Sequence, residues 1–252
     1  MGQWKIAVAA PIAVGLVLLG TPAIGQNYGA ADLGIGRLAY IQPGTYLAGE
    51  SIGFSLDPLG GNYLLRFRGA AEVFVLYVDR GTMGGRVLKY DSGETAIMVS
   101  GWGGLTLYPD QAPQGLPAVR VSDSEAPSPP SIAVSDMQAA AGDESQRLAY
   151  VRRINVQFTA DWNALSDNSQ TRSYAFDAME NAARGVERAT NSSQVRDAFA
   201  RRISVIAIAA GGRPTLALNG RTLIITFNPG AGFPGRASSR AIARALLNVL
   251  SR

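Results

Sequence analysis

The segment 61–108 carries short stretches in which apolar residues either alternate with polar ones or run on unbroken. In Glu72–Val78 (EVFVLYV) nearly every position is apolar, as is typical of a strand covered on both faces. The loop Asp91–Glu94 (DSGE) is a hairpin signal, because Asp accepts hydrogen bonds from turn amides and Gly tolerates positive φ. The pattern predicts an antiparallel meander, within an antiparallel β domain that spans residues 26–119.

The pattern changes beyond residue 119. Residues 120–142 are rich in Pro and Ser, which predicts a flexible linker. Apolar residues then recur at helical spacing, and Asn219-Gly220 between two apolar stretches is a strong hairpin signal. The helices expected on this basis are Asp143–Ile154, Ser169–Ala189, one over 195–210, and Ser238–Leu250. A strand over Ile203–Ile208 is the alternative for the later half of the third helix.

Together these elements predict an α+β protein. An N-terminal antiparallel β-sheet domain is followed by the linker and by a second domain over residues 143–252, in which helices pack on a small β-hairpin or sheet.

The N-terminus has the pattern of an export signal. A single Lys precedes an apolar run, and small residues follow it, so residues 1–25 are predicted to be a signal peptide that is cleaved after Gly25. An uncleaved membrane anchor is the alternative, but the run is shorter than the ~20 residues that span a bilayer and Pro11 interrupts it. We therefore expect a periplasmic or extracellular protein with no integral membrane span after cleavage.

The composition excludes several kinds of chemistry. The chain has no Cys and no His, so Ser-His-Asp triads, thiol nucleophiles, disulfides, Cys-linked lipid anchors and ordinary zinc or non-haem iron sites are all removed. The 23 Lys and Arg residues against 19 Asp and Glu give a net charge of +4, and the basic residues are scattered. This distribution argues against nucleic acid as a partner, and no cofactor or metal is expected.

Four carboxylates on or beside the predicted sheet are the remaining candidates for catalysis: Glu72, Asp79, Asp91 and Glu94. Two of them held across a cleft would suit hydrolysis of a glycoside, which needs neither His nor Cys. The alternative is that Asp91 and Glu94 are ordinary hairpin-turn residues. No residue is therefore assigned as catalytic.

Two groups of residues are candidates for binding. Trp102 lies among glycines, and with Tyr90 and Asp91 it would form an exposed aromatic platform for a ligand, although a core tryptophan beside a bend explains it as well. Gly230–Gly235 (GAGFPG) matches G-x-G-x-x-G before a helix, where an anion would be held with Arg236 or Arg240. A plain turn is the alternative, because no second strand follows and a proline lies inside the loop.

The β domain contains the stretches Arg66-Phe67, Glu72-Val73-Phe74, Asp79-Arg80, Gly85–Thr95, Gly101–Tyr108 and Pro113–Pro117. Together they resemble a family of exported bacterial proteins of unknown function, and the resemblance extends more faintly to the C-terminal part. The resemblance implies an envelope or periplasmic protein of a Gram-negative bacterium, and it brings no assigned activity. The leading hypothesis is thus a non-enzymatic binding or structural module that meets an unknown envelope component or small ligand. The alternative is a carboxylate-based hydrolase that acts on cell-wall sugar or peptide.

Overall fold

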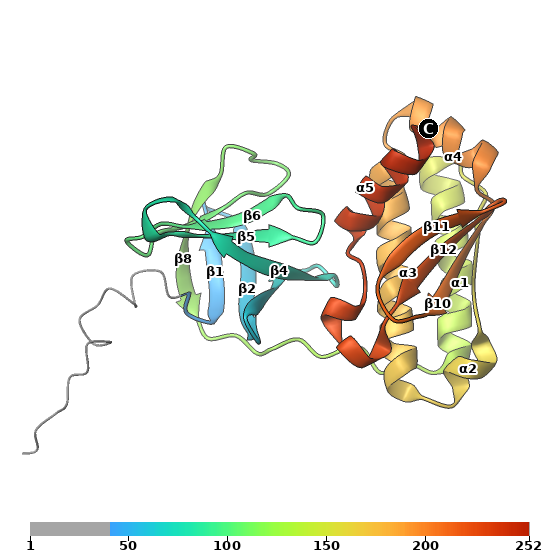
Figure 1. Ribbon diagram of the computed structural model, residues 1–252, viewed down its shortest axis with the longest axis horizontal. Helices are drawn as coiled ribbons and strands as arrows, with labels where there is room; N and C mark the ends of the chain where they lie inside the picture. The colour runs from blue at the N-terminus through green and yellow to red at the C-terminus, as the bar shows by residue number, and fades with distance from the viewer. Residues whose placement is uncertain (1–40, 252) are drawn as a thin grey trace, which may run out of the picture. The chain divides into compact units, whose positions relative to one another are not determined.

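The computed structural model describes residues 41–251 (Figure 1). The predicted signal peptide and its cleavage site lie outside the described residues. The fold is mixed α+β, as the sequence predicts, with a β-rich part followed by a part in which helices pack on a small sheet. No helix within residues 41–251 combines the length and the apolar character that crossing a bilayer would need.

The β-rich part is a closed antiparallel barrel, where the sequence had predicted only an antiparallel sheet. Its strands are β1 Gly44–Ala48, β2 Ile52–Leu59, β3 Asn62–Phe67, β4 Val73–Arg80, β5 Arg86–Tyr90, β6 Thr95–Val99, β7 Leu105–Leu107 and β8 Leu116–Ser122. Each strand pairs with the next, and β8 pairs back with β1 through contacts such as Tyr46 with Arg120. Closure leaves no sheet edge unpaired.

Aromatic rings fill the inside of the barrel. Tyr46 stacks on Phe54 with ring centroids 5.4 Å apart, and Phe74 meets Tyr90 edge-on at 5.2 Å. Phe67 lies between these pairs and contacts both Phe54 and Phe74. A small barrel has room for side chains alone, so this row of rings is its core.

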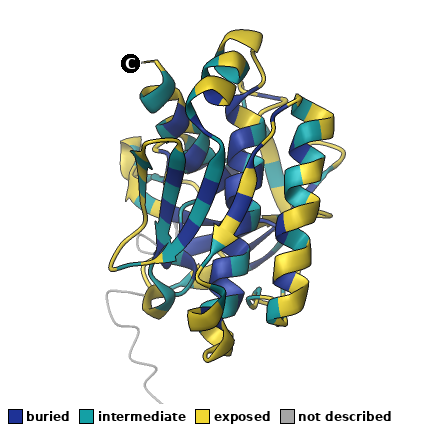
Figure 2. Cartoon of the chain, turned by 90° about the vertical axis from the view of Figure 1, so that its right-hand side faces the viewer, coloured by how far each residue is buried: buried dark blue, intermediate teal, exposed yellow. Residues whose placement is uncertain are grey.

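The part that follows holds a four-stranded sheet in the order β11-β12-β10-β9. The strands are β9 Gln157–Ala160, β10 Val205–Ala210, β11 Thr215–Asn219 and β12 Thr222–Phe227. The β11–β12 hairpin turns at Asn219-Gly220 as predicted, with Gly220 at φ 57°. The parallel pairing of β10 with both β9 and β12 was not predicted, because it joins strands that are distant in the sequence. Figure 2 shows buried positions alternating with less buried ones in the sheet, as they do along β10 and β12.

The helices are α1 Val134–Arg152, α2 Trp162–Ser166, α3 Ser169–Ala189, α4 Ser193–Arg202 and α5 Ser239–Leu250, with short 3₁₀ turns at Thr82–Gly84, Pro229–Ala231 and Phe233–Gly235. Helix α3 carries the largest buried face and packs closely on α5. A Cβ at Gly185 would lie 2.6 Å from Cγ2 of Ile242, so the absence of a side chain there lets the two helices approach.

Helix α1 begins earlier than the predicted start at Asp143. Its first turns contain Met137 and Ala141, which are buried. Irregular structure between β8 and α1 covers residues 123–133, against the linker of 120–142 expected from composition. The Ala-rich start of α1 was predicted as linker because its small side chains give little contrast between apolar and polar positions. At the end of α4, the strand interpretation of Ile203–Ile208 is the one observed.

The unbroken run of apolar residues in β4 is explained by the two hydrophobic cores that the strand contacts. Phe74 and Leu76 belong to the barrel core, whereas Val73 and Val75 belong to the core that contains α3 and α5. Leu64 on the neighbouring strand β3 also joins that second core. The strand is thus covered on both faces, by its own barrel on one side and by the helical part on the other.

Candidate binding cavity at the start of helix α5

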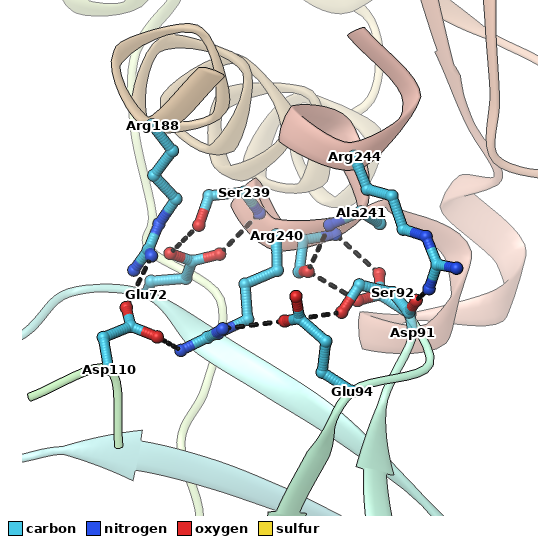
Figure 3. Close-up of polar contacts among 11 residues, drawn as sticks. Glu72, Asp91, Ser92, Glu94, Asp110, Arg188, Ser239, Arg240, Ala241 and Arg244 are labelled. Carbon is cyan, nitrogen blue, oxygen red and sulfur yellow. Dashed lines mark hydrogen bonds and ion pairs between the residues drawn. The ribbon is translucent and has the colours of Figure 1, made fainter. Parts of the chain in front are cut away.

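Two carboxylates of the barrel bind the first residues of helix α5 (Figure 3). The backbone N–H and hydroxyl of Ser238 donate to the two carboxylate oxygens of Asp91, at 2.7 and 2.5 Å. The backbone N–H and hydroxyl of Ser239 donate to the two oxygens of Glu72, both at 2.7 Å. The Ser238 hydroxyl also accepts from the N–H of Ala241 at 3.2 Å and so caps the helix.

This arrangement suits the electrostatics of a helix start. The first N–H groups of a helix have no partner inside the helix, and the helix dipole makes this end positive. Asp91 and Glu72 supply both acceptors and negative charge. Glu72 is buried, and burial raises the pKa of its carboxyl even though the hydrogen bonds from Ser239 oppose that rise.

Arg240, one residue further along α5, joins the helix to three more barrel residues. It donates to Glu94 at 2.8 Å and to Asp110, and its guanidinium lies 4.3 Å from the ring centroid of Tyr90. Figure 3 shows Arg240 between the two carboxylates. Arg188 of α3 donates to the other oxygen of Asp110 at 2.8 Å. Burial alone would raise the pKa of Asp110, but the two arginines outweigh it and lower the pKa.

Arg236, just before α5, is buried to 3% exposure. Its guanidinium forms an ion pair with Asp177 of α3. It also donates to the backbone oxygen of Val73 on β4 at 2.7 Å. It also lies 5.2 Å from the ring centroid of Phe233. Burial raises the pKa of Asp177, with Arg236 opposing that rise. One side chain therefore ties together α3, β4 and the segment that leads into α5.

A cavity of about 500 Å³ lies beside these contacts. Barrel rings and aliphatic side chains form one part of its lining, and arginines from the barrel, α3 and α5 form another. The lining includes Ile52, Phe67, Phe74, Arg68, Arg184, Arg188 and Arg240, with the carboxylates of Glu72 and Asp110. Within residues 41–251, no three carboxylates converge as a cation site would require.

The structure does not bring Trp102, Tyr90 and Asp91 together. Tyr90 is buried, and burial raises the pKa of its hydroxyl to about 12. Asp91 follows it and is engaged with Ser238. Trp102 is 87% exposed and lies just after β6. The last residue of β6, Val99, pairs with Arg86 at the start of β5, whereas Tyr90 is at the end of β5. Trp102 therefore lies at the other end of this strand pair from Tyr90.

The other candidates identified from the sequence are engaged within the chain. Asp79 pairs with Lys89 on the barrel surface at 2.7 Å, away from the α5 contacts, and the hydrogen bond from Lys89 lowers its pKa. Gly230–Gly235 forms two 3₁₀ turns, Pro229–Ala231 and Phe233–Gly235. The anions next to Arg236 and Arg240 are the chain's own carboxylates.

Several residues of this site were missed from the sequence: Arg68, Asp110, Arg184, Arg188, Ser238 and Ser239. Ser238 was identified only as a helix start. The hydrogen-bonded pairs join residues 147 and 167 positions apart, so no local spacing could reveal them. A weak signal did exist, since two adjacent serines before an amphipathic helix offer two hydroxyl donors to any nearby carboxylate.

Comparison with known proteins adds a family but no activity. Searches of curated proteins and of solved structures found no match. A family model described as "Domain of unknown function (DUF4908)" matches residues 37–246, which include the barrel, helices α1 to α4, most of α5 and the cavity. The chain therefore belongs to the DUF4908 family, a family defined by a domain of unknown function.

Proposed function

We propose that this chain is an exported protein of the cell envelope that acts by binding and not by catalysis. The leader-like residues 1–25 support export to the periplasm or beyond. The absence of His and Cys from the sequence leaves carboxylates as the main candidates for acid–base chemistry. The cavity beside α5 provides a binding site.

One observation carries this proposal: the carboxylates around the cavity are already bound by donors of the same chain. Both oxygens of Glu72 accept from Ser239, and both oxygens of Asp110 accept from arginines. Asp91 is used by Ser238 in the same way, and Glu94 accepts from Arg240. A general acid or base must reach the proton that it transfers, and these groups are instead occupied in holding α5.

A carboxylate-based hydrolase is the second candidate, and one feature favours it. Glu72 and Asp110 line the same cavity, yet the pKa of Glu72 is raised and that of Asp110 is lowered. Carboxylates whose environments push their pKa values apart are the usual acid and base of glycosidases. Replacing these two carboxylates with neutral amides therefore separates the two hypotheses: a hydrolase would lose its turnover, whereas a binding protein has no turnover to lose.

The test uses the full chain expressed in a Gram-negative host. We expect it in the periplasmic fraction with Gln26 as its first residue, as read by mass spectrometry. Incubation with purified peptidoglycan should release no more soluble fragment from the wild type than from Glu72→Gln, Asp110→Asn or the surface control Asp79→Asn. The proposal fails if the wild type releases fragments and the first two variants lose this turnover by about 100-fold or more while the control keeps it. Finding the uncleaved protein in the cytoplasmic fraction would refute export.

A further inference from the structure

We infer that the cavity at the start of α5 binds an amphipathic organic anion, with its oxyanion on the arginines and its apolar body against the barrel rings. This inference rests on the proposed function, because it names the chemical class of ligand that such a binding module would take. Three features of the lining support it: occupied acceptors, unused donors and an apolar wall.

The acceptors of the cavity are occupied. Glu72 receives two hydrogen bonds from Ser239, and Asp110 receives one from Arg188 and one from Arg240. These carboxylates thus have much of their acceptor capacity filled. A cationic ligand would have to displace contacts that hold α5 in place.

Donors, in contrast, are left over. The side chain of Arg68 makes no hydrogen bond or ion pair with any residue in the range 41–251. Arg188 is exposed, and within residues 41–251 its guanidinium donates through Nη1 alone. Arginine only donates, and its planar fork matches carboxylates, sulfonates and phosphates. The cavity therefore offers unused positive donors to a group that only accepts.

The apolar part of the lining favours an organic ligand over a small inorganic ion. Phe74 and Phe67 come from β4 and the end of β3, and Ile52 from the start of β2. The volume of about 500 Å³ lies within the ~300–1,000 Å³ of sites for small organic molecules. Phe74 is already buried in the barrel core, whereas Phe67 and Ile52 are partly exposed. A ring or an alkyl chain that covers these two side chains would remove them from water and so add to the affinity.

Titration of the predicted mature chain with the fluorescent anion anilinonaphthalene sulfonate tests the inference. We expect saturable binding to one site and a Kd about tenfold weaker in Arg68→Gln, because one charge-assisted contact is lost. Ala71→Glu should weaken binding at least as much, since Ala71 is an exposed lining residue and a carboxylate there repels the anion. Arg80→Gln is the matched control: it removes an exposed barrel arginine that does not line the cavity, and it should change nothing.

Comparison of ligands tests both ends of the molecule. The neutral analogue N-phenylnaphthylamine should bind about tenfold or more weakly than the sulfonate, which isolates the role of charge. Laurate should displace the probe, whereas inorganic phosphate at the same concentration should not. Far- and near-UV circular dichroism must match in all variants, because this dye also binds partly folded chains.

Equal affinity for the probe in the wild type, Arg68→Gln and Ala71→Glu would overturn the inference. So would equally tight binding of the neutral analogue, or displacement by phosphate as effective as that by laurate. None of these results depends on export or on peptidoglycan turnover. The ligand class would then be wrong while the proposed function stands.

Discussion

Replacing Arg236 with methionine is expected to lower the free energy of unfolding by about 3–5 kcal/mol. Methionine keeps most of the apolar stem but removes both donors, so Asp177 is left buried without its cation and the backbone oxygen of Val73 loses a partner. Breaking one side of a buried ion pair costs far more than a surface pair is worth. Urea unfolding followed by circular dichroism measures the loss.

The pH dependence of this loss has a defined sign. The pKa of Asp177 is already raised by burial, and removing Arg236 takes away the charge that opposes that rise. A carboxyl with a raised folded-state pKa costs stability above its unfolded-state pKa, and the cost levels off above the folded-state pKa. The extra loss in Arg236→Met should therefore be small near pH 4, grow as the pH rises above the folded-state pKa of Asp177 in the wild type, and level off above the higher pKa of the variant. The largest loss is therefore expected at neutral pH.

Two further variants control for the Arg236 experiment. Adding Asp177→Asn to Arg236→Met should recover most of the stability, because the unpaired buried charge is gone. Arg213→Met, at an exposed position, should change stability by no more than about 0.5 kcal/mol. A loss of less than about 1 kcal/mol in Arg236→Met at neutral pH would contradict the role given to this pair.

Gly235→Ala is expected to destabilise the protein by about 2–3 kcal/mol through overpacking. A Cβ at Gly235 would lie 2.0 Å from the backbone oxygen of Asn228, and a backbone atom cannot rotate away as a flexible side chain can. Asn228 also donates its N–H to the backbone oxygen of Gly235, so the two segments are fixed against each other. Thermal unfolding of the variant should show a clearly lowered midpoint.

Gly230 lies in the same glycine-rich loop and provides the matched control. Its added Cβ would meet only the Asn228 side chain, at 3.4 Å, which is ordinary contact. Gly230→Ala should therefore stay within about 1 kcal/mol of the wild type. If both glycines had equal effects on stability, the close backbone approach at Gly235 would not be what requires a glycine in this loop.

Much of the fold could be predicted because its signals are local. The hairpin at Asn219-Gly220, the amphipathic pattern of α3 and the apolar strand β4 all follow from residues near one another in the chain. Barrel closure could not be predicted in this way. It depends on β8 pairing with β1, and β8 is mostly exposed, so its sequence lacks the apolar pattern of a buried strand.

The candidate site was less predictable for a related reason. Glu72, Asp91 and Glu94 were identified from their chemical type, but their partners Ser238, Ser239 and Arg240 come from a helix at the other end of the chain. A carboxylate that caps a distant helix and a catalytic carboxylate look the same in a sequence. What separates them is the set of donors that surrounds the oxygens, and that set is determined by tertiary packing.

The barrel carboxylates Glu72 and Asp91 hold the start of α5, so the barrel and the helical part form one body with a cavity beside the contact. Differential scanning calorimetry of residues 26–252 tests it most directly. We expect a single transition with calorimetric and van't Hoff enthalpies in a ratio of about 1, and two resolved transitions when Glu72→Ala and Asp91→Ala are combined. Two independent transitions in the wild type, unchanged by this double substitution, would contradict it.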